Sequence, residues 1–412
     1  MTIDWQNFFA HRTKNITGSQ IRQFFALTER PEIISFAGGF PDNDFFPRDD
    51  IAATLAQMVK EEGQLALQYG PTEGSYELRV LLAGKMSLNG APCEINNLII
   101  TNGSQQGLDL LCRTLVNSGD AVLVEEPAYI GGVGAIKSYG GNPVGITIDQ
   151  DGPIPEIMEE TIKKLIKLGK KPRMFYTVPN FQNPTGVTTS LARRLDILAI
   201  ADHYNLVIIE DDPYSELCYE GEVPPSYKSL DQCDRVIYLG SYSKVIIPGI
   251  RIGWIAGSEP LMEKVTLAKQ TTDLCSSSLG QLLSYRLSQD GYLDRHIARL
   301  NDHYRQKKNT MLDSMQQSFP ADVTFSRPRG GFFIWVSFPS HFPTSKELLT
   351  MALKRQVAFV HGEGFFSNGG GSHTARFSFS QPKIEDIHAG IKIFGDILLE
   401  IHVHSQTKAA II

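Results

Sequence analysis

The segment after the apolar run RVIYL (235–239) gathers side chains that could bind a phosphate and react with an aldehyde. It reads GSYSKVIIPGIRIG and contains Ser241, Ser243, Lys244 and Arg251. A lysine amine held away from water has a lowered pKa and can form a Schiff base with an aldehyde. Serine hydroxyls and a guanidinium that binds in a bidentate way are suitable donors to a phosphate dianion. Because a single lysine in a polar loop is normally just solvated, this chemistry needs support from other segments.

Acids follow a second apolar run, 206–209, in the segment EDDPY (210–214). Asp211 could face a pyridine nitrogen and keep it protonated, or it could cap a turn. Metal coordination is disfavoured because Pro213 interrupts the segment and no histidine is near in the sequence. The turn and the pyridine partner both stay open at this point.

Two more segments place polar groups directly after apolar runs. NPTG, which begins at Asn183, has the composition of a turn. Ser104 and Gln105, in TNGSQQG, open a predicted helix with Ser104 as its N-cap, and free N–H groups at a helix start attract anions. Each segment alone is explained by an ordinary turn or cap. Together the four segments describe one ligand with a phosphate, an aldehyde and a pyridine ring.

These groups can meet only if the apolar runs before them are strands of one sheet. Short apolar runs alternate with helical segments, which predicts an α/β fold with a mostly parallel central sheet covered by helices. Ligands of such sheets bind beyond the carboxyl ends of the strands. The predicted strands are 98–101, 121–124, 174–178, 206–209, 235–239 and 252–256. One helix is predicted after Ser104, with Leu108, Leu111, Cys112 and Leu115 at helical spacing, and another over 191–204.

The composition and the pattern of apolar residues change near both ends of the sequence. The first 47 residues are irregular, with glycines and prolines concentrated in 35–47. Three strand-like runs near the other end indicate a second, α+β unit; they are 330–339, 356–362 and 375–380. We therefore expect an N-terminal arm at the substrate entrance (1–47), a large domain (48–300) and a small domain (301–412).

Composition argues against several classes of protein. The 412 residues carry a net charge of −6, which disfavours a nucleic-acid-binding surface. The five cysteines are widely spaced without a C-x-x-C pair, so neither disulfides nor a zinc signature is expected. His402 and His404 are too few for a metal site, and no metal is expected. The sequence shows no signal peptide and no membrane span, which predicts a cytoplasmic protein.

In chain order, TNGSQQG, NPTG, D-x-x-Y and S-x-S-K-x-x-x-P-G-x-R-x-G resemble the motifs of the class I/II aminotransferases. Enzymes of this family have fold type I and depend on pyridoxal 5′-phosphate. The resemblance runs from SFAGGFP (35–41) to ARFSFS (375–380). Within the family, the segment 21–47 is most similar to the subgroup of 2-aminoadipate, kynurenine and aromatic aminotransferases.

The resemblance implies a role for each motif residue. Lys244 would be the Schiff-base lysine and proton shuttle, Asp211 would pair with the pyridinium nitrogen, and Tyr214 would act with them in catalysis. Asn183 and Tyr214 would hydrogen-bond the phenolic oxygen of the ring, and Tyr129 would stack on its face. The phosphate would be held by Ser104, Gln105, Ser241, Ser243 and Arg251.

The resemblance also implies substrate and subunit contacts. Arg376 would bind the α-carboxylate of the substrate, and Asn183 and Gly39 would also contribute to the substrate site. Tyr69 would reach the phosphate of the neighbouring subunit, which makes a homodimer the expected active unit. Arg22 would recognise a distal carboxylate, or it is a surface arginine on an amphipathic helix.

The implied activity is a ping-pong transfer of an amino group from an L-amino acid of 2-aminoadipate, aromatic or branched-chain type to a 2-oxo acid, with 2-oxoglutarate as the expected acceptor. The same residues would serve a pyridoxal-phosphate lyase, decarboxylase or cyclopropane-carboxylate synthase. A ligand-sensing regulator on this fold would carry an N-terminal winged helix, whose helical pattern and basic face the first 47 residues lack. One departure from the family is His361, in HGEGFF, where many relatives have a Pro-Gly-x-x-Phe turn; we expect a turn residue there.

Overall fold

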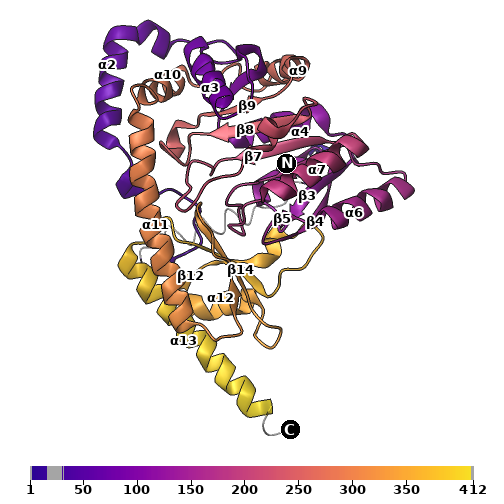
Figure 1. The fold of residues 1–412 in the computed structure, drawn as a ribbon, viewed down its shortest axis with the longest axis vertical. Helices are drawn as coiled ribbons and strands as arrows, with labels where there is room; N and C mark the ends of the chain where they lie inside the picture. Colours follow the sequence, from indigo (N-terminus) through magenta and orange to yellow (C-terminus); the bar gives the residue numbers. More distant parts are fainter. Residues whose placement is uncertain (1, 16–29, 31, 410–412) are drawn as a thin grey trace.

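The computed structural model describes residues 2–15, 30 and 32–409, and its elements form two units joined by the long helix α11 (Tyr292–Ser318) (Figure 1). The larger unit contains a mixed sheet whose strands follow one another in the order β2-β9-β8-β7-β6-β3-β4-β5. Their bounds, in that order, are Leu98–Thr101, Gly253–Ala256, Val236–Ser241, Val207–Asp212, Met174–Thr177, Ala121–Glu126, Asn142–Asp149 and Gly152–Pro153.

The sheet is mostly parallel, as the sequence predicts. The neighbouring strands from β8 to β4 all run parallel, whereas β9 is antiparallel to β2 and β8, and β5 is antiparallel to β4. The carboxyl ends of the parallel strands therefore share one edge, where ligands of such sheets bind.

Helices cover both faces of this sheet. Leu123 of β3 and Ile208 of β7 pack in one cluster with α6 (Pro155–Lys167) and α7 (Leu191–Tyr204). Neighbouring residues of the same strands belong to a second cluster, which includes α4 (Ser104–Leu115). Since successive side chains of a strand point to opposite faces, the two clusters lie on the two sides of the sheet.

The remaining helices belong to the larger unit, except α12 and α13, which belong to the smaller unit (Figure 1). Their bounds are α2 (Arg48–Leu67), α3 (Tyr76–Leu88), α5 (Ile130–Ser138), α8 (Tyr227–Leu230), α9 (Glu259–Gln270), α10 (Ser278–Leu287), α12 (Ser345–Lys354) and α13 (Ile384–Ala409). Short 3-10 helices, η1 to η6, cover Trp5–Asn7, His11–Asn15, Asn43–Phe45, Ile95–Asn97, Pro248–Ile250 and Gly362–Phe365. Among the described residues, no helix combines the length and the apolar character needed to cross a bilayer.

The smaller unit, orange to yellow in Figure 1, is built on an antiparallel sheet with the order β10-β11-β14-β13. Its strands are Thr324–Phe325, Phe333–Ser337, Thr374–Ser378 and Val360–His361. A parallel pair beside it joins β1 (Ile34–Ser35) to β12 (Val357–Ala358), so part of the N-terminal arm packs with the C-terminal unit. α11 passes residue 300 without a break, and the division at 300 stays a prediction.

Three local expectations are wrong. His361 is not in a turn, because it pairs with Ala375 at the end of β13. Ser104 is the first residue of α4 and not its N-cap; the N-cap is Gly103, with φ of 74°. The strand predicted over 206–209 does not end before the acids; β7 continues to Asp212, since the adjacent β8 offers backbone partners up to that point.

Candidate active site

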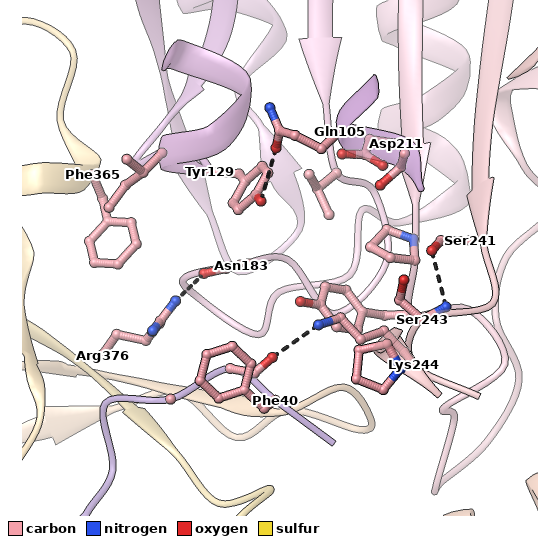
Figure 2. Close-up of a pocket in the computed structure, with 18 of the residues that line it drawn as sticks. Phe40, Gln105, Tyr129, Asn183, Asp211, Ser241, Ser243, Lys244, Phe365 and Arg376 are labelled. Carbon is pink, nitrogen blue, oxygen red and sulfur yellow. Dashed lines mark hydrogen bonds between the residues drawn. The ribbon is translucent and has the colours of Figure 1, made fainter. Parts of the chain in front are cut away.

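A cavity of about 280 Å³ lies at the carboxyl edge of the large sheet. Segments after β2, β3, β6, β7 and β8 reach it, and so do the N-terminal arm and the smaller unit. The residues that the sequence predicts and that line it are Gly39, Ser104, Gln105, Tyr129, Asn183, Asp211, Tyr214, Ser241, Ser243, Lys244, Arg251 and Arg376. The close-up in Figure 2 shows Arg376 and Asn183 on one side of the cavity and Ser241 and Ser243 on the other, with Lys244 between them.

Lys244 follows β8 and points its amine into this cavity. Its Nζ donates a hydrogen bond of 3.0 Å to the carbonyl oxygen of Gly39. Burial, together with the positive charges of Arg251 and Arg376, lowers the pKa of Lys244 to about 8, and Asp211 opposes this shift. About a tenth of the amine is therefore neutral at pH 7, far more than for an exposed lysine, which makes it a usable nucleophile and base.

Asp211, near the end of β7, presents an open carboxylate oxygen to the cavity. The side chain is 2% exposed, and its Oδ2 accepts a hydrogen bond of 2.8 Å from the hydroxyl of Tyr176. Its Oδ1 is buried without a hydrogen-bond partner among the described residues. Burial raises the pKa of Asp211 to about 7. A buried acceptor of this kind normally has a partner, so Oδ1 is matched to an N–H donor on a ligand.

The opposite side of the cavity is an anion site built on the start of α4. Ser104 and Gln105 form its first turn, where backbone N–H groups are unsatisfied. Arg251 lies close by: its guanidinium approaches the Ser243 hydroxyl at 3.4 Å, and one of its nitrogens would lie 2.6 Å from a Cβ added to Gly103. The site needs glycine at 103, both for this close approach and for its positive φ.

Arg251 itself occupies the left-handed region, with φ of 53°. A non-glycine residue in this region is strained, and such strain concentrates at functional sites because the surrounding structure must hold it. Here the strained backbone turns the guanidinium toward the start of α4, where it also donates to the carbonyl of Asn102 at 3.3 Å.

Arg376, on β14, closes the side of the cavity away from the anion site. Its guanidinium donates to Asn183 Oδ1 at 2.8 Å and to the carbonyl of Ala37 at 2.6 Å. It lies over the rings of Phe333 and Phe365, with its central carbon 4.4 and 5.3 Å from their centroids. Burial lowers the pKa of Arg376 to about 10, which still leaves it charged at neutral pH. A buried charge with few anionic neighbours is suited to a carboxylate ligand.

Two tyrosines and one asparagine complete the polar lining. The hydroxyl of Tyr129 donates to Gln105 Oε1 at 3.3 Å, which ties the Tyr129 ring to the start of α4. Tyr214 is 4% exposed, and burial raises its pKa well above the ordinary value, so it remains a hydroxyl donor. Asn183 lies beside both Arg376 and the cavity.

This arrangement fits pyridoxal phosphate by the chemistry of its donors. The anion site suits the phosphate, the open Oδ1 of Asp211 suits a pyridinium N–H, and the amine of Lys244 suits the aldehyde. The fit rests on groups from three strand ends, since the anion site draws on the ends of β2 and β8, Lys244 follows β8 and Asp211 lies near the end of β7.

Several lining residues have no signal in the sequence. Phe40, Ile130, Val178 and Phe365 form apolar wall around the polar groups. Phe365 lies in the HGEGFF segment. The one sequence feature that singles out this segment is that it stands where many relatives have a Pro-Gly-x-x-Phe turn. Tyr176, the partner of Asp211, is in a neighbouring strand, and only the strand order shows that the two residues touch.

Arg22, the predicted group for a distal carboxylate, lies outside the described residues. Tyr69 follows α2, is 77% exposed on the single chain and is not among the residues that line the cavity.

Comparison with known proteins supports the assignment of this cavity as a pyridoxal phosphate site, independently of its geometry. The model of the family "Aminotransferase class I and II" matches residues 31–393. The aromatic-amino-acid aminotransferase 1 of Thermococcus litoralis is 37% identical over 400 residues, which cover 97% of this chain and 96% of that protein.

Two solved structures are similar over nearly their whole length. The kynurenine aminotransferase of Pyrococcus horikoshii, in complex with PMP, has a TM-score of 0.92 at 38% identity and covers 96% of this chain and 98% of its own. The α-aminoadipate aminotransferase of Thermus thermophilus, complexed with N-(5′-phosphopyridoxyl)-L-leucine, has a TM-score of 0.90 at 34% identity and covers 97% and 100%. The chain therefore belongs to the class I and II aminotransferases of fold type I, and it transfers amino groups with pyridoxal phosphate as its cofactor.

Proposed function

We propose that this aminotransferase takes its amino group from an aromatic or other large apolar L-amino acid and passes it to 2-oxoglutarate. The observation that carries the proposal is the pairing of one buried carboxylate-binding group, Arg376, with apolar lining from Phe40, Ile130 and Phe365. A donor held by its carboxylate at Arg376 meets aromatic rings with its side chain. Donors of the branched-chain or 2-aminoadipate type remain in the tested set.

Arg376 orients the donor. Its two outer nitrogens now donate to Asn183 and to the Ala37 carbonyl, while Nε is buried and lacks a partner among the described residues. A substrate carboxylate takes up these donors in a bidentate geometry, which fixes the α-carbon relative to the rest of the cavity. The acceptor carries the same carboxylate, so one site serves both substrates.

Lys244 moves the proton. Its amine is held at the Gly39 carbonyl by a single hydrogen bond, and its lowered pKa leaves it able to accept a proton from the α-carbon of a bound donor and return it. Pyridoxal phosphate supplies an aldehyde that accepts the amino group and a ring that takes up the negative charge left at the α-carbon. The donor's 2-oxo acid leaves before the acceptor binds, which gives ping-pong kinetics.

The remaining lining residues would hold the cofactor ring beside Lys244. Asp211 would keep the ring nitrogen protonated through its open Oδ1, while Tyr176 fixes the other oxygen of Asp211. The phosphate would be bound by Ser104, Gln105, Ser241, Ser243 and Arg251, and Tyr129 would cover the ring face. Asn183 and Tyr214 would hydrogen-bond the phenolic oxygen of the ring.

We also propose that the active unit is a homodimer in which Tyr69 reaches the partner's phosphate site. The region around Tyr69 carries several exposed apolar side chains, and on a monomer their contact with water would be unfavourable. They are Val59, Leu65, Leu67, Tyr76 and Val80, on α2, α3 and the residues that join them. A cytoplasmic location, also proposed, agrees with five free cysteines and no disulfide among them.

A panel of donors tests the substrate proposal. The holoenzyme is incubated with 2-oxoglutarate and single L-amino acids, aromatic, branched-chain, 2-aminoadipate and aspartate, and glutamate formation is measured. Aromatic donors should give the highest kcat/KM and aspartate the lowest. Equal rates for all donors would contradict the role of the apolar wall, and release of ammonia or carbon dioxide without glutamate would contradict amino transfer to 2-oxoglutarate.

A further inference from the structure

Three metal-binding side chains from distant parts of the sequence meet in the smaller unit. Asp322 lies after α11, His341 lies between β11 and α12, and His402 lies on α13. One ligand atom from each residue lies within 4.8 Å of the other two. The sequence places only His402 and His404 near each other, so the fold adds the two ligands that the sequence could not associate with His402.

The distances among these atoms are close to those of a metal centre. His341 Nε2 lies 3.3 Å from Asp322 Oδ2, and His402 Nδ1 lies 3.8 Å from the same oxygen. In a tetrahedral zinc site, bonds of about 2.0–2.1 Å place neighbouring ligand atoms about 3.3–3.4 Å apart. The three atoms lie within 4.8 Å of one another, so side-chain rotations that draw them together by up to about 1.4 Å would let all three bind one ion.

The two imidazoles are held in place by an aromatic neighbour. The ring of Phe342 stacks on that of His402, with centroids 6.2 Å apart and an angle of 23°, and it also contacts His341 at 4.6 Å. The three side chains are 36%, 43% and 27% exposed for Asp322, His341 and His402, so an ion from solution can reach them. None of the three lines the active-site cavity.

We propose that Asp322, His341 and His402 bind a divalent transition-metal ion, with Zn²⁺ as the best match. Two imidazoles and one carboxylate are typical ligands of zinc and of its neighbours cobalt and nickel, whereas calcium and magnesium require sites made of oxygen atoms. Water takes the fourth position. Because the ligands come from α13 and from two loops, the ion joins the C-terminal helix to the rest of the smaller unit. Its effect is on the stability of this unit and not on the chemistry at Lys244.

Metal binding to the holoenzyme tests this site directly. Protein dialysed against Zn²⁺ at about pH 7.5 should retain one ion per chain and show a raised midpoint of thermal unfolding. His341→Ala and Asp322→Asn should each weaken binding at least about tenfold, since loss of even an outer-shell partner of a metal site weakens binding by ~10–100-fold. His203→Ala, at an exposed histidine of α7, is the matched control and should bind as the wild type does.

The variants separate this site from other metal binding. The five free cysteines are present in every protein compared, so any zinc bound by cysteine stays the same across the set. Equal zinc content in the wild type, His341→Ala and Asp322→Asn would overturn the proposal. Absence of retained zinc in the wild type would also overturn it and leave an ion pair between His341 and Asp322 as the sole role of the cluster.

Discussion

Arg376 is the residue on which substrate binding depends most in the proposed function. It is 7% exposed, keeps two hydrogen bonds to the chain, and lies over two phenylalanine rings. This environment holds the plane of the guanidinium fixed before any substrate arrives. The flat, two-point donor cannot be replaced by the single point charge of a lysine.

Arg376→Lys should therefore lower kcat/KM by about 100-fold for donor and acceptor alike, because both lose the second hydrogen bond to the carboxylate, worth roughly 2–3 kcal/mol. Steady-state kinetics with each substrate varied in turn measures this. Cofactor absorbance should be unchanged, since Arg376 lies away from the phosphate site. Arg327→Lys, at an arginine on the surface of the smaller unit, should have wild-type kinetics. An unchanged kcat/KM in the Arg376 variant would exclude it as the carboxylate group.

Lys244 should reveal its environment through the pH dependence of its reactivity. Its pKa of about 8 lies below the ordinary lysine value because burial and two neighbouring cations disfavour the charged amine. As pH rises, Lys244 loses its proton near pH 8, whereas an exposed lysine stays protonated until about pH 10.4.

Acetylation of the cofactor-free enzyme, followed by mass spectrometry of its peptides, measures this difference. Labelling of Lys244 should rise to a plateau with a midpoint near pH 8, and labelling of a lysine in a short reference peptide should still be rising at pH 9. A common midpoint for the two lysines would show that the cavity does not lower the pKa of Lys244.

At the scale of elements, the loop that carries Asn183 is attached to strand β3 by hydrogen bonds to a buried carboxylate. Glu125, in β3, is 3% exposed and accepts hydrogen bonds from Thr177 Oγ1 at 2.6 Å, Val178 N at 3.1 Å and Gln182 Nε2 at 2.6 Å. Burial raises the pKa of Glu125 to about 7, and these three donors limit the rise. The end of β6 and the Asn183 turn are thus attached to the neighbouring strand.

Glu125→Ala should lower the free energy of unfolding by at least about 1–3 kcal/mol, because it removes the carboxylate oxygens and leaves the buried Val178 N–H without its acceptor. The midpoint of chemical denaturation measures the loss. KM should rise more than kcat falls, since Asn183 is mispositioned but Lys244 is untouched. Glu222→Ala, at an exposed acid, is the control. Wild-type stability in the Glu125 variant would show that the three hydrogen bonds do not hold the turn.

Elements with strong local signals could be predicted closely from the sequence. β2 and α7 have the predicted bounds, and α7 is delimited by a capping serine, Ser190, and by Asn205 in the left-handed conformation. The ends of β7 and β8 could not be predicted, because their last residues, Asp212 and Ser241, are polar and are extended only through pairing with neighbouring strands.

The same limit applies to the site. Motif residues such as Lys244 and Arg251 lie in one segment and carry their own signal. Phe365 enters the cavity only because its loop is attached to the larger unit, where the Phe365 carbonyl accepts a hydrogen bond of 2.8 Å from Ala128 N. Contacts between distant segments of this kind have no local pattern that a sequence could display.

At the scale of the whole molecule, the proposed homodimer has two chains per active unit. In it, Tyr69 and the exposed apolar side chains around it would gain their partner from a second copy. Lys244→Ala and Tyr69→Ala should each be strongly impaired, for different reasons: the first lacks the reacting amine and the second a contact to the partner's phosphate.

Mixing these two variants tests the shared site. If each site takes Lys244 from one chain and Tyr69 from the other, a mixed dimer has one site with both changes and one intact site. Random exchange of equal amounts should then restore about a quarter of wild-type activity, because half the dimers are mixed and half of their sites are intact. Activity no higher than the mean of the separate variants would contradict shared sites.

The central claim is that the amine of Lys244 is the group that holds the cofactor and that a donor displaces it. Borohydride reduction of the holoenzyme, followed by peptide mass spectrometry, tests it most directly. The account predicts a reduced phosphopyridoxyl group on Lys244, and its loss from that residue when an aromatic donor is added before the reduction. The group on another lysine, or an unaltered Lys244 in the reduced holoenzyme, would contradict the account.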